Sequence, residues 1–321
     1  MNLNFRQLRA LYLQVQHQAG SVAVALATLS DARDLQGKLI KRLQVEGTST
    51  IAARSVAASI ARQMSEHAAT QGNTQEAIKL CREALTHKPD DTESLDAEWG
   101  RQAICSMVEI CLNPDSTAGA ALESPEPDSR DSREAALKTA ERLLAELKPR
   151  PVSEERNIYR LLCCFLALAR REKQAAESAL QELTMLAGCV SYAGVTLALA
   201  TAYLVLKQAT RARNQLKRVS KQVWSFEEAE YLERCWLLLA ELYIQTGKYD
   251  VASELLRRAL QHNKSCARAY ELLGLITEKE QLHREAASNY EQAWTHGGRS
   301  NPATGYKLAF NLLKAKRGTL L

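Results

Sequence analysis

Few residues of this sequence stand in a pattern that supports metal or redox chemistry. The 8 cysteines form no Cys-x-x-Cys pair, and only His262 and Cys266 have a spacing that would bring two metal ligands together. A structural zinc site takes four ligands, usually as two such pairs, and the sequence offers no second pair. We therefore interpret the cysteines as reduced thiols that pack as small hydrophobic side chains, as expected in a reducing compartment.

Motifs that bind phosphate or activate water for catalysis are also absent from the sequence. It contains no GxxxxGK, GxGxxG or HExxH motif, and its Ser, His, Asp and Cys residues show no spacing typical of a nucleophile and its base. The acidic and basic residues lie mostly on the exposed faces of predicted helices, where they are expected to be solvated. The sequence thus predicts a protein that is not an enzyme and that needs no cofactor and no metal.

One segment, residues 207–221, concentrates positive charge. It contains no acidic residue and these basic ones: Lys207, Arg211, Arg213, Lys217, Arg218 and Lys221. The spacing of Arg213, Lys217 and Lys221 predicts that they share one face of a helix. The segment is either a solvated outer face or a docking site for an acidic protein surface, in which all of these residues except Lys207 make contacts. Nucleic acid is a further alternative partner.

The elements that position these residues are predicted to be helices. The 321 residues include 14 Gly and 7 Pro, which is few for a fold with many tight turns, and 46% of them are hydrophobic. The net charge of +5 is unevenly distributed, because residues 136–321 carry 28 basic and 19 acidic groups while residues 1–112 carry 12 of each. This composition excludes a wholly disordered chain and a dedicated nucleic-acid binder.

A repeated pattern of large and small residues defines the fold more closely. In the clearest copy, the first helix carries a stripe of large residues with one small residue among them: Trp236, Leu239, Ala240 and Tyr243. The second helix carries a small, a large and a small residue: Ala252, Leu256 and Ala259. The pattern recurs 34 residues later as Tyr270, Leu273, Gly274, Thr277, then Ala286, Tyr290, Ala293, and upstream as Leu199, Ala200, Tyr203, then Ala212, Leu216, Val219. Three copies in this order are typical of tetratricopeptide repeats.

Close packing explains this spacing. Small residues such as Ala240 and Gly274 allow the second helix of a pair to approach the first, and one pair cannot bury its apolar stripe alone. The sequence therefore predicts an all-α fold of tetratricopeptide helix pairs stacked as an α-solenoid. Weaker copies are predicted around Gly20–Ala32, Gly72–Pro89 and Tyr159–Leu183. Near the end of the sequence, the first helix of one more repeat is predicted to contain Tyr306, Ala309, Phe310 and Leu313.

Three regions are predicted along the chain. Residues 1–112 form degenerate repeat-like helices, residues 113–135 a flexible acidic linker with Pro and Ser, and residues 136–321 the main repeat array. The linker holds three of the seven prolines and six acidic residues against two basic ones.

Two apolar segments admit other interpretations. Ser21–Leu29 resembles the apolar part of a signal peptide, but Gln and His residues interrupt the segment before it. Leu183–Leu206 contains no charge and has the length of a membrane span, but a Gly-flanked polar turn within it favours two helices.

The repeat surfaces give two expectations about partners. Some tetratricopeptide domains bind a terminal carboxylate through Lys and Asn on their concave helices, but the equivalent positions here are Leu197 and Thr201, Leu237 and Glu241, and Glu271 and Leu275. That ligand class is therefore not expected. The stripe of Tyr306, Phe310 and Leu313 precedes only a short polar stretch, so we expect it to contact a partner helix or a second copy of the chain.

Several longer runs resemble one particular family. They are LKQATRARNQLKRVSK at 206–221, CWLLLAELY at 235–243, HNKSC at 262–266, TEKEQ at 277–281, NPATGYKLAFNLLKAKR at 301–317 and WGRQAICSMVEICLNPD at 99–115. Together they resemble the tetratricopeptide subunit of intraflagellar transport complex A over most of residues 99–317, and residues 23–42 resemble it more faintly. Family members are several-fold longer, so the resemblance is to their C-terminal portion. Pro89 and Trp99 are too close to leave room for the repeats that the family carries there.

The resemblance implies a non-enzymatic scaffold that acts in retrograde ciliary transport, cilium biogenesis and the localisation of cargo. It implies other complex A subunits and ciliary cargo adaptors as partners, and a location in the cytoplasm, the cilium or flagellum and the basal body. The repeats by themselves imply only protein binding without nucleic acid or a membrane span. An RNA-binding helical-repeat protein is the alternative, although Leu197, Leu237 and Glu271 are not the polar base-reading residues that such a protein needs in every repeat.

Overall fold

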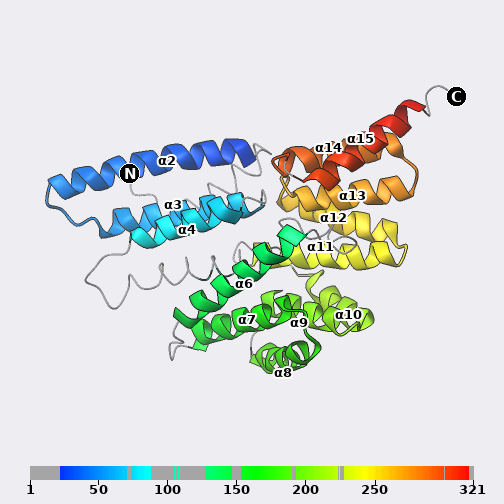
Figure 1. Cartoon of the computed structure of the whole chain (residues 1–321), viewed down its shortest axis with the longest axis horizontal. Helices are drawn as coiled ribbons and strands as arrows, with labels where there is room; N and C mark the ends of the chain where they lie inside the picture. The colour runs from blue at the N-terminus through cyan, green and yellow to red at the C-terminus, as the bar shows by residue number, and fades with distance from the viewer. Residues whose placement is uncertain are drawn as a thin grey trace. The chain divides into compact units, whose positions relative to one another are not determined.

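The computed structural model describes residues 22–70, 74–87, 105, 108, 127–146, 153–189, 193–222, 224, 228–299 and 301–317. All regular secondary structure within these residues is helical (Figure 1). The predicted all-α fold of tetratricopeptide helical repeats is confirmed. Residues 1–148 and 149–321 form two compact units, and each is described by itself.

The first unit contains α2 (Val22–Val45), α3 (Ile51–Thr70), α4 (Thr74–Thr86) and α6 (Pro127–Glu146). Helix α3 packs on α4 through a buried cluster of Ala58, Ala61 and Ala84, and on α2 through Ala53, Ala57 and Ile40. Residues 127–135 belong to α6, although they were predicted to be part of a flexible linker. The physical reason is that Pro127 occupies the first position of the helix, where its fixed φ and missing N–H are tolerated. Residues 113–126 of the predicted linker lie outside the described residues.

The second unit is a series of helix pairs in which each helix packs on the next (Figure 1). Its helices are α7 (Ser153–Ala169), α8 (Lys173–Cys189), α9 (Ala193–Val205), α10 (Ala209–Val219), α11 (Ala229–Gln245), α12 (Tyr249–His262), α13 (Ala267–Lys279), α14 (His283–His296) and α15 (Pro302–Arg317). The apolar segment Leu183–Leu206 is therefore divided between α8 and α9. None of the helices in the described ranges is both long and apolar enough to span a bilayer.

The stripes of the repeat pattern face the core of this unit. The large residues Trp236, Leu239 and Leu256 are almost completely buried, and so is Tyr290. Tyr270, Leu273 and Thr277 are half-buried. Ala240, Gly274, Ala252, Ala259, Ala286 and Ala293 are buried, and Tyr243 is nearly so. Because the small residues remove bulk where the helices cross, the large residues of the partner helix fill the space.

The turn inside each pair uses one residue in the left-handed conformation. After α11, Gly247 has φ 71°, and the N–H of Lys248 donates to the carbonyl of Tyr243 over 2.9 Å. The equivalent residues Lys207 and Gln281 have φ 58° and 62° with the same hydrogen-bond pattern. This arrangement ends a helix by satisfying its last carbonyl groups, and it normally selects glycine. Two of these turns therefore carry local strain.

Candidate protein-binding surfaces

The basic segment 207–221 forms α10 and the turns on either side of it. Ala212, Leu216 and Val219 bury one side of the helix. Lys207, Arg211, Lys217, Arg218 and Lys221 are all exposed. Arg211 donates from Nη1 to Oε1 of Gln208 over 3.0 Å. Among the described residues no carboxylate forms an ion pair with any of these cations. Their charges are thus available to a partner.

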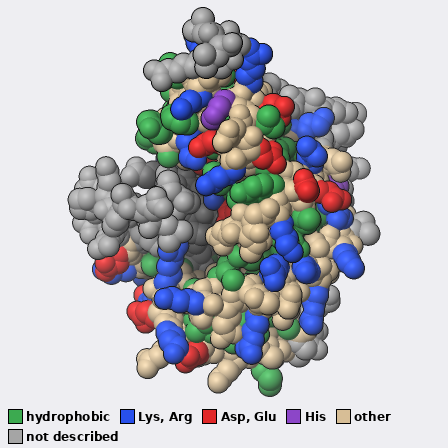
Figure 2. All heavy atoms as spheres, turned by 90° about the vertical axis from the view of Figure 1, so that its right-hand side faces the viewer, with side chains coloured by type: hydrophobic (Ala, Val, Ile, Leu, Met, Phe, Trp, Pro, Cys, Tyr) green, Lys and Arg blue, Asp and Glu red, His purple; other side chains and the backbone are tan. Residues whose placement is uncertain are grey.

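Of the predicted stripe, Arg213 and Lys217 lie one turn apart within α10, and Lys221 lies in the turn beyond its last residue. Arg213 is half-buried, and its Nε is buried without a hydrogen-bond partner in the described part of the chain. At 100° per residue, Arg211 and Arg218 also fall on one side of α10. The exposed basic surface therefore consists of Lys207, Arg211, Lys217, Arg218 and Lys221, which we call the α10 surface. Figure 2 shows a face of the molecule on which Lys and Arg side chains gather.

Aromatic stacking and hydrogen bonds fix the loop that carries Lys221. The guanidinium of Arg258 donates to the carbonyls of Ser220 over 2.6 Å and Gln222 over 3.0 Å, and it lies 4.8 Å from the ring of Trp236. The ring of Trp224 stacks on His262 at 4.8 Å. Trp224 also packs against the core of the unit. Sequence reasoning missed Arg258, whose partners are backbone carbonyls far away in sequence.

The first helices of consecutive pairs form a face whose cations are already paired. Arg268 contacts Glu241 and Glu271, each at 2.7 Å. Burial lowers the pKa of Arg268, but the two carboxylates more than compensate and raise it above its ordinary value. Lys307 pairs with Glu278 at 3.4 Å. A peptide carboxylate could therefore bind either cation only by displacing an existing ion pair.

Helix α15 has a polar inner face. Its Asn311 is fully buried, and the Oδ1 atom of Asn311 accepts a hydrogen bond from Nδ1 of His283 over 2.9 Å. Glu278 accepts hydrogen bonds from Tyr290 over 2.7 Å and from Lys307 and Asn311 over 3.4 Å. Burial alone would raise the pKa of Glu278, but these donors and the charge of Lys307 lower it, so the carboxylate is ionised. The residues predicted to contact a partner, Tyr306, Phe310 and Leu313, are exposed on the other side of the helix.

The candidate metal pair is used for packing. His262 stacks between Trp224 and Trp236, and Cys266 is buried at the start of α13. Burial and the neighbouring Glu233 raise the pKa of the Cys266 thiol, and burial raises the pKa of Cys235 to about 12. Across the described ranges, no group of three or more His, Cys, Asp or Glu side chains is placed to hold a metal ion.

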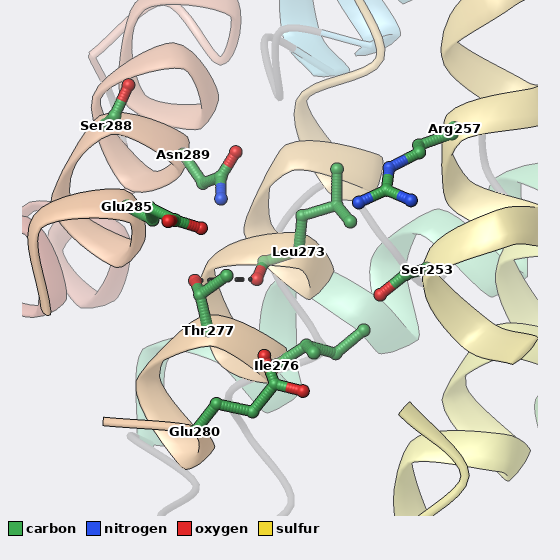
Figure 3. Close-up of a pocket in the computed structure, with 9 residues that line it drawn as sticks. All are labelled: Ser253, Arg257, Leu273, Ile276, Thr277, Glu280, Glu285, Ser288 and Asn289. Atoms are coloured by element: carbon green, nitrogen blue, oxygen red, sulfur yellow. Dashed lines mark hydrogen bonds between the residues drawn. The ribbon is translucent and has the colours of Figure 1, made fainter. Parts of the chain in front are cut away.

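A shallow polar groove lies between α12, α13 and α14 (Figure 3). Its lining residues are Ser253, Arg257, Leu273, Ile276, Thr277, Glu280, Glu285, Ser288 and Asn289. The Thr277 hydroxyl donates to the carbonyl of Leu273 over 3.0 Å. The groove combines charges of both signs with an apolar lining from Leu273 and Ile276, and it is open to solvent rather than an enclosed ligand site.

Fold and surfaces together define a tetratricopeptide-type helical-repeat protein whose available chemistry is protein binding. The family model for the "Tetratricopeptide repeat protein 21 C-terminal ARM domain" matches residues 139–320. The family model for the fourth ARM domain of the same protein matches residues 3–85. The chain belongs to the tetratricopeptide repeat protein 21 family. This confirms the resemblance found in the sequence. The N-terminal match is wider than residues 23–42, to which the sequence runs had confined it.

Individual relatives support the same assignment. Mouse tetratricopeptide repeat protein 21B is 48% identical over 231 residues, which is 69% of this chain and 18% of the relative. Mouse protein 21A is 49% identical over 230 residues (69% and 17%), and the Caenorhabditis elegans homolog is 35% identical over 234 residues (70% and 17%). The chain thus spans less than a fifth of the length of these relatives.

Solved structures resemble the chain less closely. The human IFIT1 dimer with m7Gppp-AAAA covers 95% of this chain and 63% of its own, at 15% identity and a TM-score of 0.47. A likeness of this size assigns no function.

Proposed function

We propose that the chain is a non-enzymatic scaffold of retrograde ciliary transport, related to the tetratricopeptide subunit of intraflagellar transport complex A. The observation that carries the proposal is the family match over residues 139–320. Its partners would be other complex A subunits and ciliary cargo adaptors, and its location the cytoplasm, the cilium and the basal body. The predicted flexible linker is reduced to residues 113–126, because residues 127–135 are helical, and residues 136–321 stay the predicted main repeat array.

Co-purification from ciliated cells tests this role. The tagged 321-residue chain is expected to recover complex A subunits, as identified by mass spectrometry, and to colocalise with the basal body and cilium. Recovery of a soluble chain without any ciliary protein, together with a diffuse cellular distribution, would contradict the proposal.

Within this role, we propose that the α10 surface binds an acidic protein surface. Its cations are exposed and none forms an ion pair with a described carboxylate, so a partner need not displace an existing contact. Arg213 is half-buried beside these cations and stays a predicted contact. Exposed ion pairs are weak individually, so affinity would come from several cations acting together.

Charge reversal at three exposed positions tests the α10 surface. Arg211→Glu, Arg218→Glu and Lys221→Glu together should reduce partner recovery, leave the circular dichroism spectrum unchanged, and have a smaller effect as salt rises. The matched control reverses Lys248, Lys264 and Lys279, which are exposed elsewhere in the same unit. Equal recovery by the wild type and the α10 variant would show that this surface is only solvated.

RNA binding has less support as an alternative function. At three equivalent repeat positions, Leu197 and Leu237 are apolar and Glu271 is engaged by Arg268. A gel shift with single-stranded RNA that weakens steeply with salt, and that the α10 reversal abolishes, would favour RNA over an acidic protein.

A further inference from the structure

Helix α15 buries polar side chains and exposes large apolar ones. A helix at a protein surface normally turns its apolar residues inward and its polar residues to solvent. In α15 the buried residues include Thr304 and Asn311, whereas Tyr306 is 72% and Leu313 is 65% exposed. Leu312 and Phe310, at 48% and 36%, extend the exposed apolar surface. On the inner face, Asn311 forms hydrogen bonds with His283 and Glu278, and Gly305 packs closely on the Trp294 ring. The exposed apolar residues therefore belong to a helix whose inner face is well packed.

The outer face has the pattern of a surface that receives a helix. Tyr306, Ala309, Phe310 and Leu313 have the spacing of Trp236, Leu239, Ala240 and Tyr243 in α11. In that pair the next helix covers the stripe through Ala252, Leu256 and Ala259, all of which are buried. The same relation holds between α13 and α14.

Phe310 specifies the shape of the covering helix. The equivalent position is Ala240 in α11 and Gly274 in α13, and the large residue of the second helix lies against it. A β-carbon at Gly274 would come within 2.9 Å of the Tyr290 ring. With Phe310 supplying the bulk from α15, the facing residue must be small. The complementary helix thus carries three small residues in place of the small, large, small pattern.

Charge selects the flanks of the covering helix. Lys314 and Lys316 are exposed near the end of α15, and residues 302–317 contain no acidic residue, while Lys307 is paired with Glu278 on the inner side. The ammonium of Lys314 lies 5.7 Å from the Phe310 ring, at the edge of the apolar stripe. A second copy of α15 would bring like charges together, which disfavours self-association through this face.

We propose that the outer face of α15 binds an acidic amphipathic helix of a partner protein, with a small residue of that helix facing Phe310. The proposal extends the scaffold role to a particular surface. It depends on that role in one respect, which is that the ligand is a protein. A measurement with purified components tests it separately from the ciliary assignment.

A synthetic peptide with the α12 sequence, residues 249–262, supplies the probe after three changes. Leu256→Ala provides the small central residue, and Arg257→Glu and Arg258→Glu provide the acidic flank. The labelled peptide is expected to bind the full chain saturably in fluorescence anisotropy. Leu313→Glu in the chain should weaken binding about tenfold or more. The matched control is Met185→Glu, since Met185 is 70% exposed on another helix of the same unit.

Each outcome decides the proposal. The unmodified α12 peptide, with its Leu and two Arg residues, should bind at least about tenfold more weakly than the acidic probe. Equal binding by wild type and Leu313→Glu chains, or no saturable binding, would overturn the proposal. Light scattering that shows a dimer abolished by Leu313→Glu would assign the face to a second copy and would overturn it as well. A failed ciliary co-purification would leave these results unchanged.

Discussion

The contact between Gly274 and Tyr290 allows one packing prediction to be worked through in detail. A β-carbon at residue 274 would lie 2.9 Å from Cε1 and 3.0 Å from Cδ1 and Cζ of the Tyr290 ring. These distances are several tenths of an ångström shorter than ordinary van der Waals contact. The ring is fully buried, and its hydroxyl donates to Glu278 over 2.7 Å, so it is held at both ends. We therefore predict that Gly274→Ala destabilises the second unit.

Two opposing effects set the magnitude. Overpacking a fixed ring costs about 2–3 kcal/mol, towards the upper part of the usual range. Replacing glycine by alanine inside a helix gains about 1 kcal/mol. The net loss is then about 1–2 kcal/mol, which lowers the melting temperature of a unit of this size by about 2–8 °C.

A double-mutant cycle checks the cause. Thermal unfolding of the full chain is measured for Gly274→Ala in the wild type and in a Tyr290→Ala background, where the ring is absent. In that background Gly274→Ala should be neutral or stabilising by about 0.5–1 kcal/mol. Gly37→Ala is the matched control, because Gly37 is helical and a β-carbon there meets nothing within 4 Å. An equal loss of stability in both backgrounds would show that the ring contact is not the cause.

Three further changes have directions fixed by the structure. Gln281→Gly should stabilise the second unit by about 0.5–1 kcal/mol in urea denaturation, because residue 281 has a left-handed φ of 62° that glycine adopts without strain; an unchanged midpoint would contradict this. Burial raises the pKa of Glu233 despite the hydrogen bond from Asn263, so stability is lost as pH rises through that raised pKa. Glu233→Gln should remove this loss in melting curves between pH 4.5 and 7, and an unaltered pH slope would refute it. Burial lowers the pKa of His67 to about 4, so stability is lost as pH falls from 6.5 towards 4; His67→Gln should abolish that loss in the first unit, and persistence of the acid sensitivity would exclude His67 as its source.

Sequence periodicity predicted the helix pairs because the spacing of small and large residues directly encodes helix crossing. The pairs α11–α12 and α13–α14 follow from residues such as Ala240 and Ala286, whose small size is needed where they lie. Pro127 misled the sequence interpretation, since proline breaks a helix only beyond its first turn. Residues of type Lys or Gln give no sign of a left-handed turn, so the strain at Lys207 and Gln281 appears only in the backbone.

The candidate surfaces were predicted in part. The positive charge of α10 follows from composition, but the partial burial of Arg213 does not, because it depends on how the neighbouring helices pack around α10. The spacing of Tyr306 and Phe310 likewise predicted a stripe on α15. The polar network beneath it depends on Glu278 and His283, which are distant in sequence and reach Asn311 only in the folded chain.

The two proposed surfaces use the excess positive charge of residues 136–321 in different ways. On α10 the cations are the whole surface, with little exposed apolar area, so binding there should weaken strongly as salt rises. On α15 Lys314 borders an apolar stripe that includes Tyr306 and Leu313, so burial of that stripe should persist in salt. A partner that remains bound at high salt and is lost only with Leu313→Glu would therefore engage α15, and a partner lost at moderate salt would engage α10. The salt dependence of partner binding therefore distinguishes the two surfaces, although both are positively charged.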